Sequence, residues 1–350
     1  MAALTAVTLP RARRAPGRPM LRTAARLGAG VAIVVATALV VGVGPFLRGV
    51  AAISPVAVVT AFVLVAVSTA AAAWRWRVVA AGFGLPLPWR EAFGAYYRSQ
   101  FLNAVLPGGV VGDVHRAYAH GRPREQVGAA ARAVAAERVF GQVVQLTLTL
   151  AVLVPLAAMR SAWSSPLAPV AWGAGALAGL VALTVGIAAA VPRSRRLLLR
   201  EYRMLRPLLV RPIALAAIVL ASLAAVAAHV ALFLVAAAAT GVTADPRGLV
   251  AAALVVLAAS ALPINVGGWG PREAAAGAAF ALAGPGGAAG VATSTAFGVL
   301  ALLAVAPGAL VLLHRSVTSR TVPNGRRTQR QPAVRDGSRN TVTGREGDRG

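Results

Sequence analysis

The chain lacks cysteine, and it also lacks lysine, so that all 35 of its basic residues are arginine. The absence of cysteine excludes disulfide frameworks, thiolate nucleophiles and cysteine-based metal sites. The absence of lysine excludes a P-loop lysine and Schiff-base chemistry. Charged residues make up only 13% of the 350 residues, about half of what a soluble protein carries. An ordinary soluble enzyme is therefore excluded.

Apolar residues take the place of the missing charge, and they make up 58% of the chain. Several apolar runs of 18 or more residues contain no charged residue, which is the length needed to cross a bilayer as a helix. The fold predicted is an all-α, polytopic transmembrane helical bundle. The four histidines are scattered with no carboxylate at a familiar ligand spacing, so we expect neither a metal nor another cofactor.

The apolar runs predict about six to eight membrane spans. Two of the segments are interrupted by polar residues, glycine and proline, and we interpret them as broken or re-entrant, because such backbone is tolerated at membrane depth only inside protein or beside a wet cavity. The clear spans are predicted at 27–46, 54–73, 139–158, 168–191, 213–239 and 288–313, and the two broken segments at 89–112 and 249–283.

Arginine is concentrated beside the spans and in the tails, as the positive-inside rule requires for cytoplasmic segments. This pattern divides the chain into a basic N-terminal segment (1–26), a transmembrane domain (27–314) and a disordered arginine-rich tail (315–350), with both termini in the cytoplasm. With a net charge of +25, we therefore expect the partners of the basic segments to be anionic lipid headgroups rather than nucleic acid. We read Trp74-Arg75-Trp76-Arg77 as an interfacial belt of aromatic residues and cations.

The two broken segments share the pattern L-P-x-x-V-x-G, beginning at Leu106 and at Leu262. Matching interruptions in two halves of a membrane protein indicate a transporter binding site and an inverted repeat. A helix broken inside the membrane leaves free N–H and C=O groups that can hold a polar headgroup. The alternative is that both segments are ordinary Pro-Gly turns at helix ends.

Ionisable residues follow each break. Asp113 and Arg116 lie one helical turn apart, where Arg116 would contact a lipid phosphate and Asp113 would orient it; alternatively Asp113 caps a helix and Arg116 is an interfacial anchor. Arg272 would hold a phosphate together with the glycine-rich loop before it, or would stay solvated beside a tight turn. Glu273 sits where the dipole of a new helix favours a carboxylate.

Glu137 and Arg138 open the predicted span 139–158. A carboxylate there is costly unless it is paired, so Glu137 would meet Arg272 or Arg116 inside the bundle; alternatively it lies in a first turn, where the helix dipole favours it. His229 falls in the middle of a span, either as a proton relay or as a neutral group bonded to a neighbouring helix. The cavity or an interfacial belt would include Tyr96, Tyr97, Arg98 and Asn103.

In these motifs the chain resembles the family that includes the transmembrane region of lysylphosphatidylglycerol synthases, whose members are described as flippase-like. The resemblance covers about residues 25–315. It is carried by Trp74-Arg75-Trp76-Arg77 with Gly82, by 103–109 with Gly112, Asp113 and Arg116, by Glu137-Arg138, and by Pro263-x-x-x-Gly267-Gly268-x-Gly270-x-Arg272-Glu273.

The resemblance implies a polytopic bacterial or archaeal membrane protein, and the best-known members of the family move or modify lipids. We expect a multi-pass transporter of the bacterial cytoplasmic membrane that handles an anionic phospholipid or a polyprenyl-phosphate-linked lipid. The last span is followed only by the short tail, so the aminoacyl transfer of the full synthases is not carried over. The alternatives are a membrane enzyme or accessory subunit of polyprenyl-phosphate glycosyl transfer, with a glycosyltransferase or a lipid-modifying protein as partner, and a structural membrane protein. The substrate-binding residues expected are Asn103, Pro107, Gly108, Gly109, Asp113, Arg116, Glu137, Arg138, Gly267, Gly268, Gly270, Arg272 and Glu273.

Overall fold

All regular secondary structure in the described part of the chain is helical, with ten α-helices, one short 3-10 helix and no strand. The structure is a computed structural model. Most of the predicted span 27–46, the predicted span 168–191 and the tail 315–350 lie outside the described residues. The residues that the structure describes are 35, 38, 39, 42–106, 109–159, 192–261 and 269–311.

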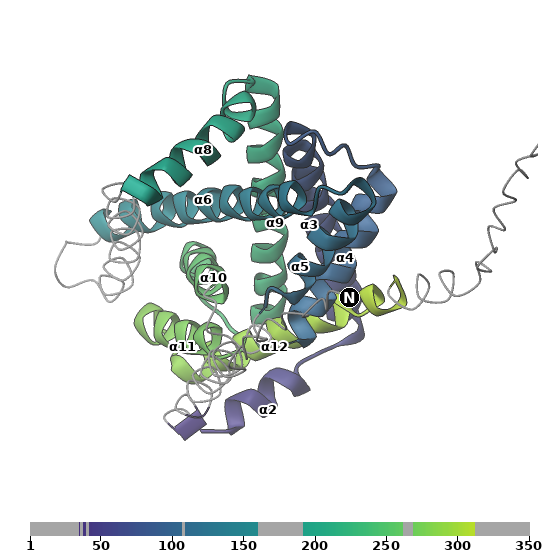
Figure 1. Cartoon of the computed structure of the whole chain (residues 1–350). Helices are drawn as coiled ribbons and strands as arrows, with labels where there is room; N and C mark the ends of the chain where they lie inside the picture. The colour runs from purple at the N-terminus through teal and green to yellow at the C-terminus, as the bar shows by residue number, and fades with distance from the viewer. Residues whose placement is uncertain are drawn as a thin grey trace, which may run out of the picture.

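The described helices are drawn in Figure 1, coloured in chain order. They are α2 (Gly44–Ala51), α3 (Pro55–Gly82), α4 (Trp89–Val105), α5 (Val111–Gly121), η1 (Arg122–Arg124), α6 (Val127–Met159), α8 (Pro192–Leu209), α9 (Pro212–Ala239), α10 (Pro246–Ser260), α11 (Pro271–Ala283) and α12 (Gly287–Val305).

Four helical segments are long and apolar enough to cross a membrane, and α10 is a shorter apolar helix. Their length follows from stretches rich in alanine, leucine and valine, because a helix of about 20 mostly apolar residues satisfies its own backbone across the hydrocarbon. The multi-pass helical architecture is therefore confirmed for the described residues, and the remaining predicted spans stay predictions. The four segments are Pro55–Gly82, Val127–Pro155, Pro212–Ala239 and Gly287–Val311.

The long helices α3 and α9 lie side by side, and α6 crosses both of them (Figure 1). The main apolar core lies between α3, α9, α10, α11 and α12. At its centre the ring of Phe233 packs against the rings of Phe280 and Phe297, with centroids 6.1 and 5.8 Å apart. A second core of buried side chains joins α3, α4, α5 and α6 around Trp76. The charged residues described below lie where these two cores meet.

The helix α3 extends nine residues beyond the predicted span 54–73 and carries the Trp-Arg-Trp-Arg motif inside the bundle. Arg75 and Trp76 are buried, whereas Trp74 is exposed, so the prediction of an interfacial belt is wrong for the two central residues of the motif. The physical reason is that no glycine with a left-handed backbone occurs between the start of α3 at Pro55 and Gly84, which has φ of 73°, and alanine and arginine favour continued helix.

The helix α6 begins at Val127, twelve residues before the predicted start of the span 139–158. The alanine-rich stretch before Glu137 has high helix propensity and extends the helix beyond its apolar part. Glu137 is therefore in the interior of a helix rather than in a first turn, and the explanation by the helix dipole is wrong. Its charge must be balanced by side chains.

Both predicted helix interruptions appear as ends of helices. The helix α4 ends at Val105 and α5 begins at Val111, while α10 ends at Ser260 and α11 begins at Pro271. The close approach of α5 to α4 requires a glycine, because a Cβ on Gly112 would lie 2.0 Å from the carbonyl oxygen of Ser99. Internal symmetry between the two halves stays a prediction.

Candidate functional site

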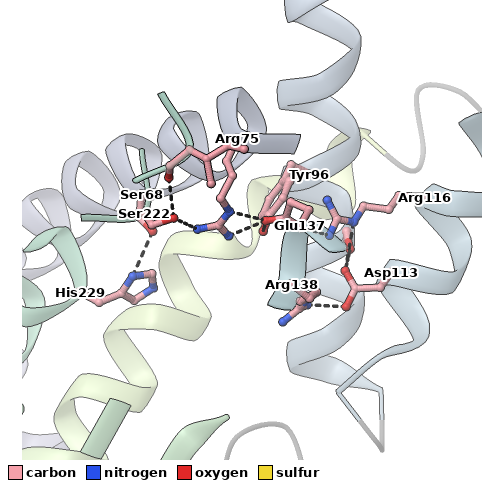
Figure 2. Close-up of polar contacts among 11 residues, drawn as sticks. Ser68, Arg75, Tyr96, Asp113, Arg116, Glu137, Arg138, Ser222 and His229 are labelled. Carbon is pink, nitrogen blue, oxygen red and sulfur yellow. Dashed lines mark hydrogen bonds and ion pairs between the residues drawn. The ribbon is translucent and has the colours of Figure 1, made fainter. Parts of the chain in front are cut away.

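Glu137 is the centre of a buried group of charges drawn from three helices (Figure 2). Its side chain has no exposed area. Arg75 of α3 donates from Nε to Glu137 Oε1 at 2.9 Å and also from Nη2, and Arg116 of α5 donates from Nη2 to Oε2 at 2.7 Å. The hydroxyl of Tyr96 donates to Oε1 at 3.2 Å. The one negative charge of Glu137 thus compensates only part of the positive charge of the two buried guanidinium groups.

Asp113 extends this group toward the end of α4. It accepts from Arg116 Nε at 3.0 Å and forms an ion pair with Arg138 of α6. Ser99 and Asn103 each donate to one of its oxygens at 3.2 Å. The Glu137 cluster, as we name it, consists of Arg75, Tyr96, Asp113, Arg116, Glu137 and Arg138.

Aromatic faces complete the surroundings of Arg116. Its guanidinium carbon lies 4.3 Å from the ring centre of Tyr96 and 4.8 Å from that of Trp76. Nη1 is buried and has no hydrogen-bond partner among the described residues. Contact with the negative faces of two aromatic rings stabilises a guanidinium group that water does not reach.

A second group of charges lies at the start of α11. Arg272 donates from Nε and Nη2 to Glu273 Oε1 at 2.8 and 2.6 Å, while Ser294 of α12 accepts from Arg272 and donates to Glu273, each at 3.2 Å. The N–H of Gly270, whose φ is 109°, donates to Glu273 Oε2 at 2.7 Å. We call Gly270, Arg272, Glu273 and Ser294 the Glu273 cluster.

The approach of α12 to Arg272 depends on the absence of a side chain at one position. A Cβ on Gly298 would lie 2.0 Å from Arg272 Nη2. The guanidinium carbon also lies 4.8 Å from the ring centre of Trp269 and 5.6 Å from that of Phe297. Arg272 is therefore held by a carboxylate, a hydroxyl and two aromatic rings, whereas Arg116 is held by two carboxylates and two aromatic rings.

The two clusters face one cavity of about 350 Å³. It collects three guanidinium groups from α3, α6 and α11, together with neutral hydrogen-bonding groups on α6, α9 and α10, and an apolar wall. The residues that line it are Arg75, Tyr96, Arg138, Gly141, Gln142, Gln145, Ser222, Ala225, Val226, His229, Leu257, Ser260, Ala261, Arg272, Phe297 and Ala301.

The charges around the cavity do not balance. The five ion pairs of the described residues contain four guanidinium groups and three carboxylates, an excess of one positive charge. Arg138 is the least enclosed of the four, because 44% of its side chain is exposed. An arginine cannot lose its proton at any relevant pH. The cavity therefore has a permanent positive excess at a place that apolar helices surround.

A model of the lysylphosphatidylglycerol synthase TM region matches residues 26–308. The chain belongs to this family. No curated protein and no solved structure matches the chain. The matched range contains every residue of both clusters and of the cavity. Members of this family are membrane proteins of flippase-like type, and the chain is accordingly a multi-pass integral membrane protein.

The structure brings together most of the residues that the family motifs pointed to. Of the two partners predicted for Glu137, Arg116 is found and Arg272 is not, because Arg272 pairs with its neighbour Glu273. Asn103 and Gly112 join α4 to α5 through a bond of 2.7 Å from the Gly112 N–H to the Asn103 side chain. Gly109, two residues before α5 begins, has φ of 60°. Four residues of the predicted site, Pro107, Gly108, Gly267 and Gly268, lie outside the described residues.

Several groups around the cavity were missed by the sequence prediction. Arg75 was read as an interfacial anchor, yet it makes the bonds to Glu137 and donates from Nη1 to Ser222 at 3.0 Å. Gln142 and Gln145, on the same helix as Glu137, also line the cavity. Their spacing of four and seven residues from Arg138 places them on one helical face with it, and this periodicity was the available signal.

Proposed function

We propose that the protein moves an anionic lipid headgroup, carried by a phospholipid or a polyprenyl-phosphate-linked lipid, across the membrane through the cavity between the Glu137 and Glu273 clusters. One observation carries the proposal: three guanidinium groups from separate helices line one cavity inside a membrane protein, and the surrounding ion pairs have one positive charge in excess. That charge is complementary to a single phosphate diester.

The physical basis is differential solvation. An ionised headgroup in hydrocarbon loses its hydration at a cost of many kcal/mol, which is the barrier to unassisted crossing. Guanidinium groups replace part of that hydration, because each can donate two parallel hydrogen bonds to phosphate oxygens. The neutral donors and acceptors on α6, α9 and α10 can bond the rest of the headgroup, while the acyl chains remain in lipid.

The same geometry favours binding over chemical catalysis. Asp113, Glu137 and Glu273 each accept hydrogen bonds from at least one guanidinium group. A general base needs a free lone pair within reach of the proton that it removes. Carboxylates held in this way serve to hold arginines, and this supports a transporter over the alternative of a glycosyl-transfer enzyme.

The bacterial cytoplasmic membrane, with both termini in the cytoplasm, remains our prediction for the location. It follows from the arginine distribution, and the anionic lipids of the cytoplasmic leaflet would then be the partners closest to the basic segments.

The experiment that tests the function is lipid translocation in proteoliposomes of phosphatidylcholine containing a trace of fluorescent short-chain phosphatidylglycerol. Albumin extracts the labelled lipid from the outer leaflet, and the rate of extraction of the inner pool measures translocation. We expect wild-type protein to accelerate this rate well above that of protein-free vesicles, and labelled phosphatidylcholine to move more slowly than labelled phosphatidylglycerol.

Two variants link the rate to the cavity. Arg138→Gln removes the most exposed of the lining guanidinium groups, and Arg272→Ala removes the one held at α11; both should lower the rate at least tenfold, since a charge-assisted bond contributes about 1.5–3 kcal/mol. Arg90→Gln is the matched control, because Arg90 is exposed on α4 and does not line the cavity. A wild-type rate equal to that of protein-free vesicles would overturn the proposal.

A further inference from the structure

The cavity contains one group that can titrate near neutral pH and that the ion pairs do not use. His229 of α9 lines the cavity wall and takes part in none of the five ion pairs. In Figure 2 its ring lies below Ser68 and apart from the Glu137 cluster. An ionisable residue within a membrane-spanning helix is costly and is retained where it has a task.

The hydrogen bonds of His229 fix which ring nitrogen carries the proton. Nδ1 lies 2.8 Å from the carbonyl oxygen of Ala225 and 3.0 Å from Ser68 Oγ. A carbonyl oxygen can only accept, so Nδ1 must carry a hydrogen, shared between the two oxygens. The lone pair of the neutral ring is therefore at Nε2, which has no hydrogen-bond partner among the described residues. A second proton would add at Nε2 without disturbing the bonds at Nδ1.

The charged groups around His229 differ from it in one respect. On the neighbouring helices these are Arg75 on α3, Glu137 and Arg138 on α6, and Arg272 and Glu273 on α11. Each arginine keeps its charge at all relevant pH values, and each carboxylate is held by a guanidinium group.

The remaining neighbours of α9 bring no further titratable side chain to the cavity. The described lining residues of α10 and α12 are neutral, and no described residue of α8 lines the cavity. Tyr96 of α4 also lines the cavity, but a phenol stays neutral near pH 7. Imidazole is the side chain that changes charge between pH 5 and 8. Among the described lining residues, His229 is therefore the group that can change the charge of the cavity near neutral pH.

His229 and Ser222, the residue of α9 that binds Arg75, lie on the same face of α9. Ser222, which accepts from Arg75, and His229 are seven residues apart, or about 10 Å along a helix. A headgroup between them would contact a guanidinium group at one end and the imidazole at the other. Protonation of Nε2 raises the positive excess from one charge to two, which strengthens the attraction of an anion at either end.

We propose that His229 couples headgroup movement to protons: Nε2 takes up a proton when the anionic headgroup binds and releases it when the headgroup leaves. This inference rests on the proposed function and assigns its coupling ion. Because linkage is reciprocal, an anion that favours the protonated imidazole must bind more tightly when protons are abundant.

The test is the pH profile of translocation, measured with the phosphatidylglycerol probe at equal pH on both sides of the membrane from 5.5 to 8.5. The phosphate diester keeps its charge over this range, so a change in rate reports on the protein. We expect the wild-type rate to fall about tenfold from pH 6 to pH 8, in line with ordinary coupling between two binding events. A pH indicator trapped in the vesicles should show lumenal alkalinisation as the anionic lipid moves outward to the albumin.

His229→Gln removes the titratable imidazole but keeps a hydrogen bond, because the glutamine amide N–H can still donate to the carbonyl oxygen of Ala225. We expect its profile to be flat and the lumenal alkalinisation to be lost. His120→Gln is the matched control: burial and the nearby Arg124 lower the pKa of His120, but this residue lies on α5 outside the cavity lining, so the variant should keep the wild-type profile.

The outcomes distinguish this inference from the function on which it rests. Translocation that is fast but independent of pH in wild type overturns the coupling alone, and so does a wild-type slope in His229→Gln. Absence of translocation at every pH overturns the proposed function and the coupling together. If His229→Gln does not fold, the wild-type profile still decides, and Ser68→Ala, which keeps the imidazole, should shift the midpoint of the profile by removing one acceptor at Nδ1.

Discussion

The Glu137 cluster draws its charged groups from three helices, whereas the ion pair of the Glu273 cluster joins two consecutive residues of one helix. In the first, the loss of any one charge changes the balance at residues far away in the sequence. In the second, Gly270 and Ser294 confine the effect to a helix start and one neighbour. The comparison separates a charge network that holds helices together from one that shapes a single turn.

The largest expected effect comes from Glu137→Gln. The substitution leaves Arg75 and Arg116 buried without their shared carboxylate, and breaking a buried ion pair by removing one partner costs about 3–5 kcal/mol. Unfolding by dodecyl sulfate in mixed micelles measures the free energy. The control Glu125→Gln, at an exposed residue of the loop before α6, should change it by less than about 0.5 kcal/mol.

Glu273→Gln should cost less, about 2 kcal/mol in the same unfolding measurement, since a hydrogen bond to a charged group contributes about 1.5–3 kcal/mol. A glutamine oxygen can still accept from the Gly270 N–H, and Arg272 keeps Ser294 and its aromatic contacts. A cost equal to that of Glu137→Gln would show that the two clusters do not differ in the way described above.

Gly298→Ala tests the approach of α12 to Arg272 without changing any charge. A methyl group there would overlap Arg272 Nη2, and overpacking typically costs about 1–3 kcal/mol; we expect the lower part of this range because the guanidinium group can move. Gly128→Ala on α6, where a Cβ meets nothing within 4 Å, is the control and should stabilise the helix by about 0.5–1 kcal/mol. Similar effects of both substitutions would contradict the close contact.

The smallest effect is expected for Ser294→Ala. It removes a hydroxyl that bonds both Arg272 and Glu273, while the direct ion pair between these residues remains. We expect a loss of about 1 kcal/mol in unfolding free energy and a modest decrease in translocation rate. Combining Ser294→Ala with Glu273→Gln should give less than the sum of the two losses, because the residues share partners.

The sequence predicted the chemistry of the site better than its geometry. Asp113, Arg116 and Glu137 could be selected because ionisable groups in or beside apolar spans need partners. Arg75 could not, because neighbouring positions of the Trp-Arg-Trp-Arg motif lie on different sides of a helix, and only the packing of α3 against α6 and α9 decides which side faces inward. The start of α6 was misplaced for a related reason, since apolarity marks the membrane and not the end of a helix.

The architecture could be predicted in the same partial way. Length and hydropathy located α3, α9 and α12 within a few residues at one or both ends, because a membrane span needs little more than an apolar run of sufficient length. The neutral groups that line the cavity, such as Ser222 and Gln145, needed the packing of three helices to be brought together. Polar residues of this kind are common in helices and carry no signal of their own.

The partnership of each arginine with a carboxylate has a consequence for release. An unpaired guanidinium group that cannot lose its proton would retain a phosphate too strongly for repeated turnover, and passage through a membrane protein requires sites that a charged cargo can leave. Arg138 has a carboxylate partner in the structure, because it forms an ion pair with Asp113. Under the proposed function, this carboxylate would take the place of the departing anion, and it would set the residence time of the lipid headgroup.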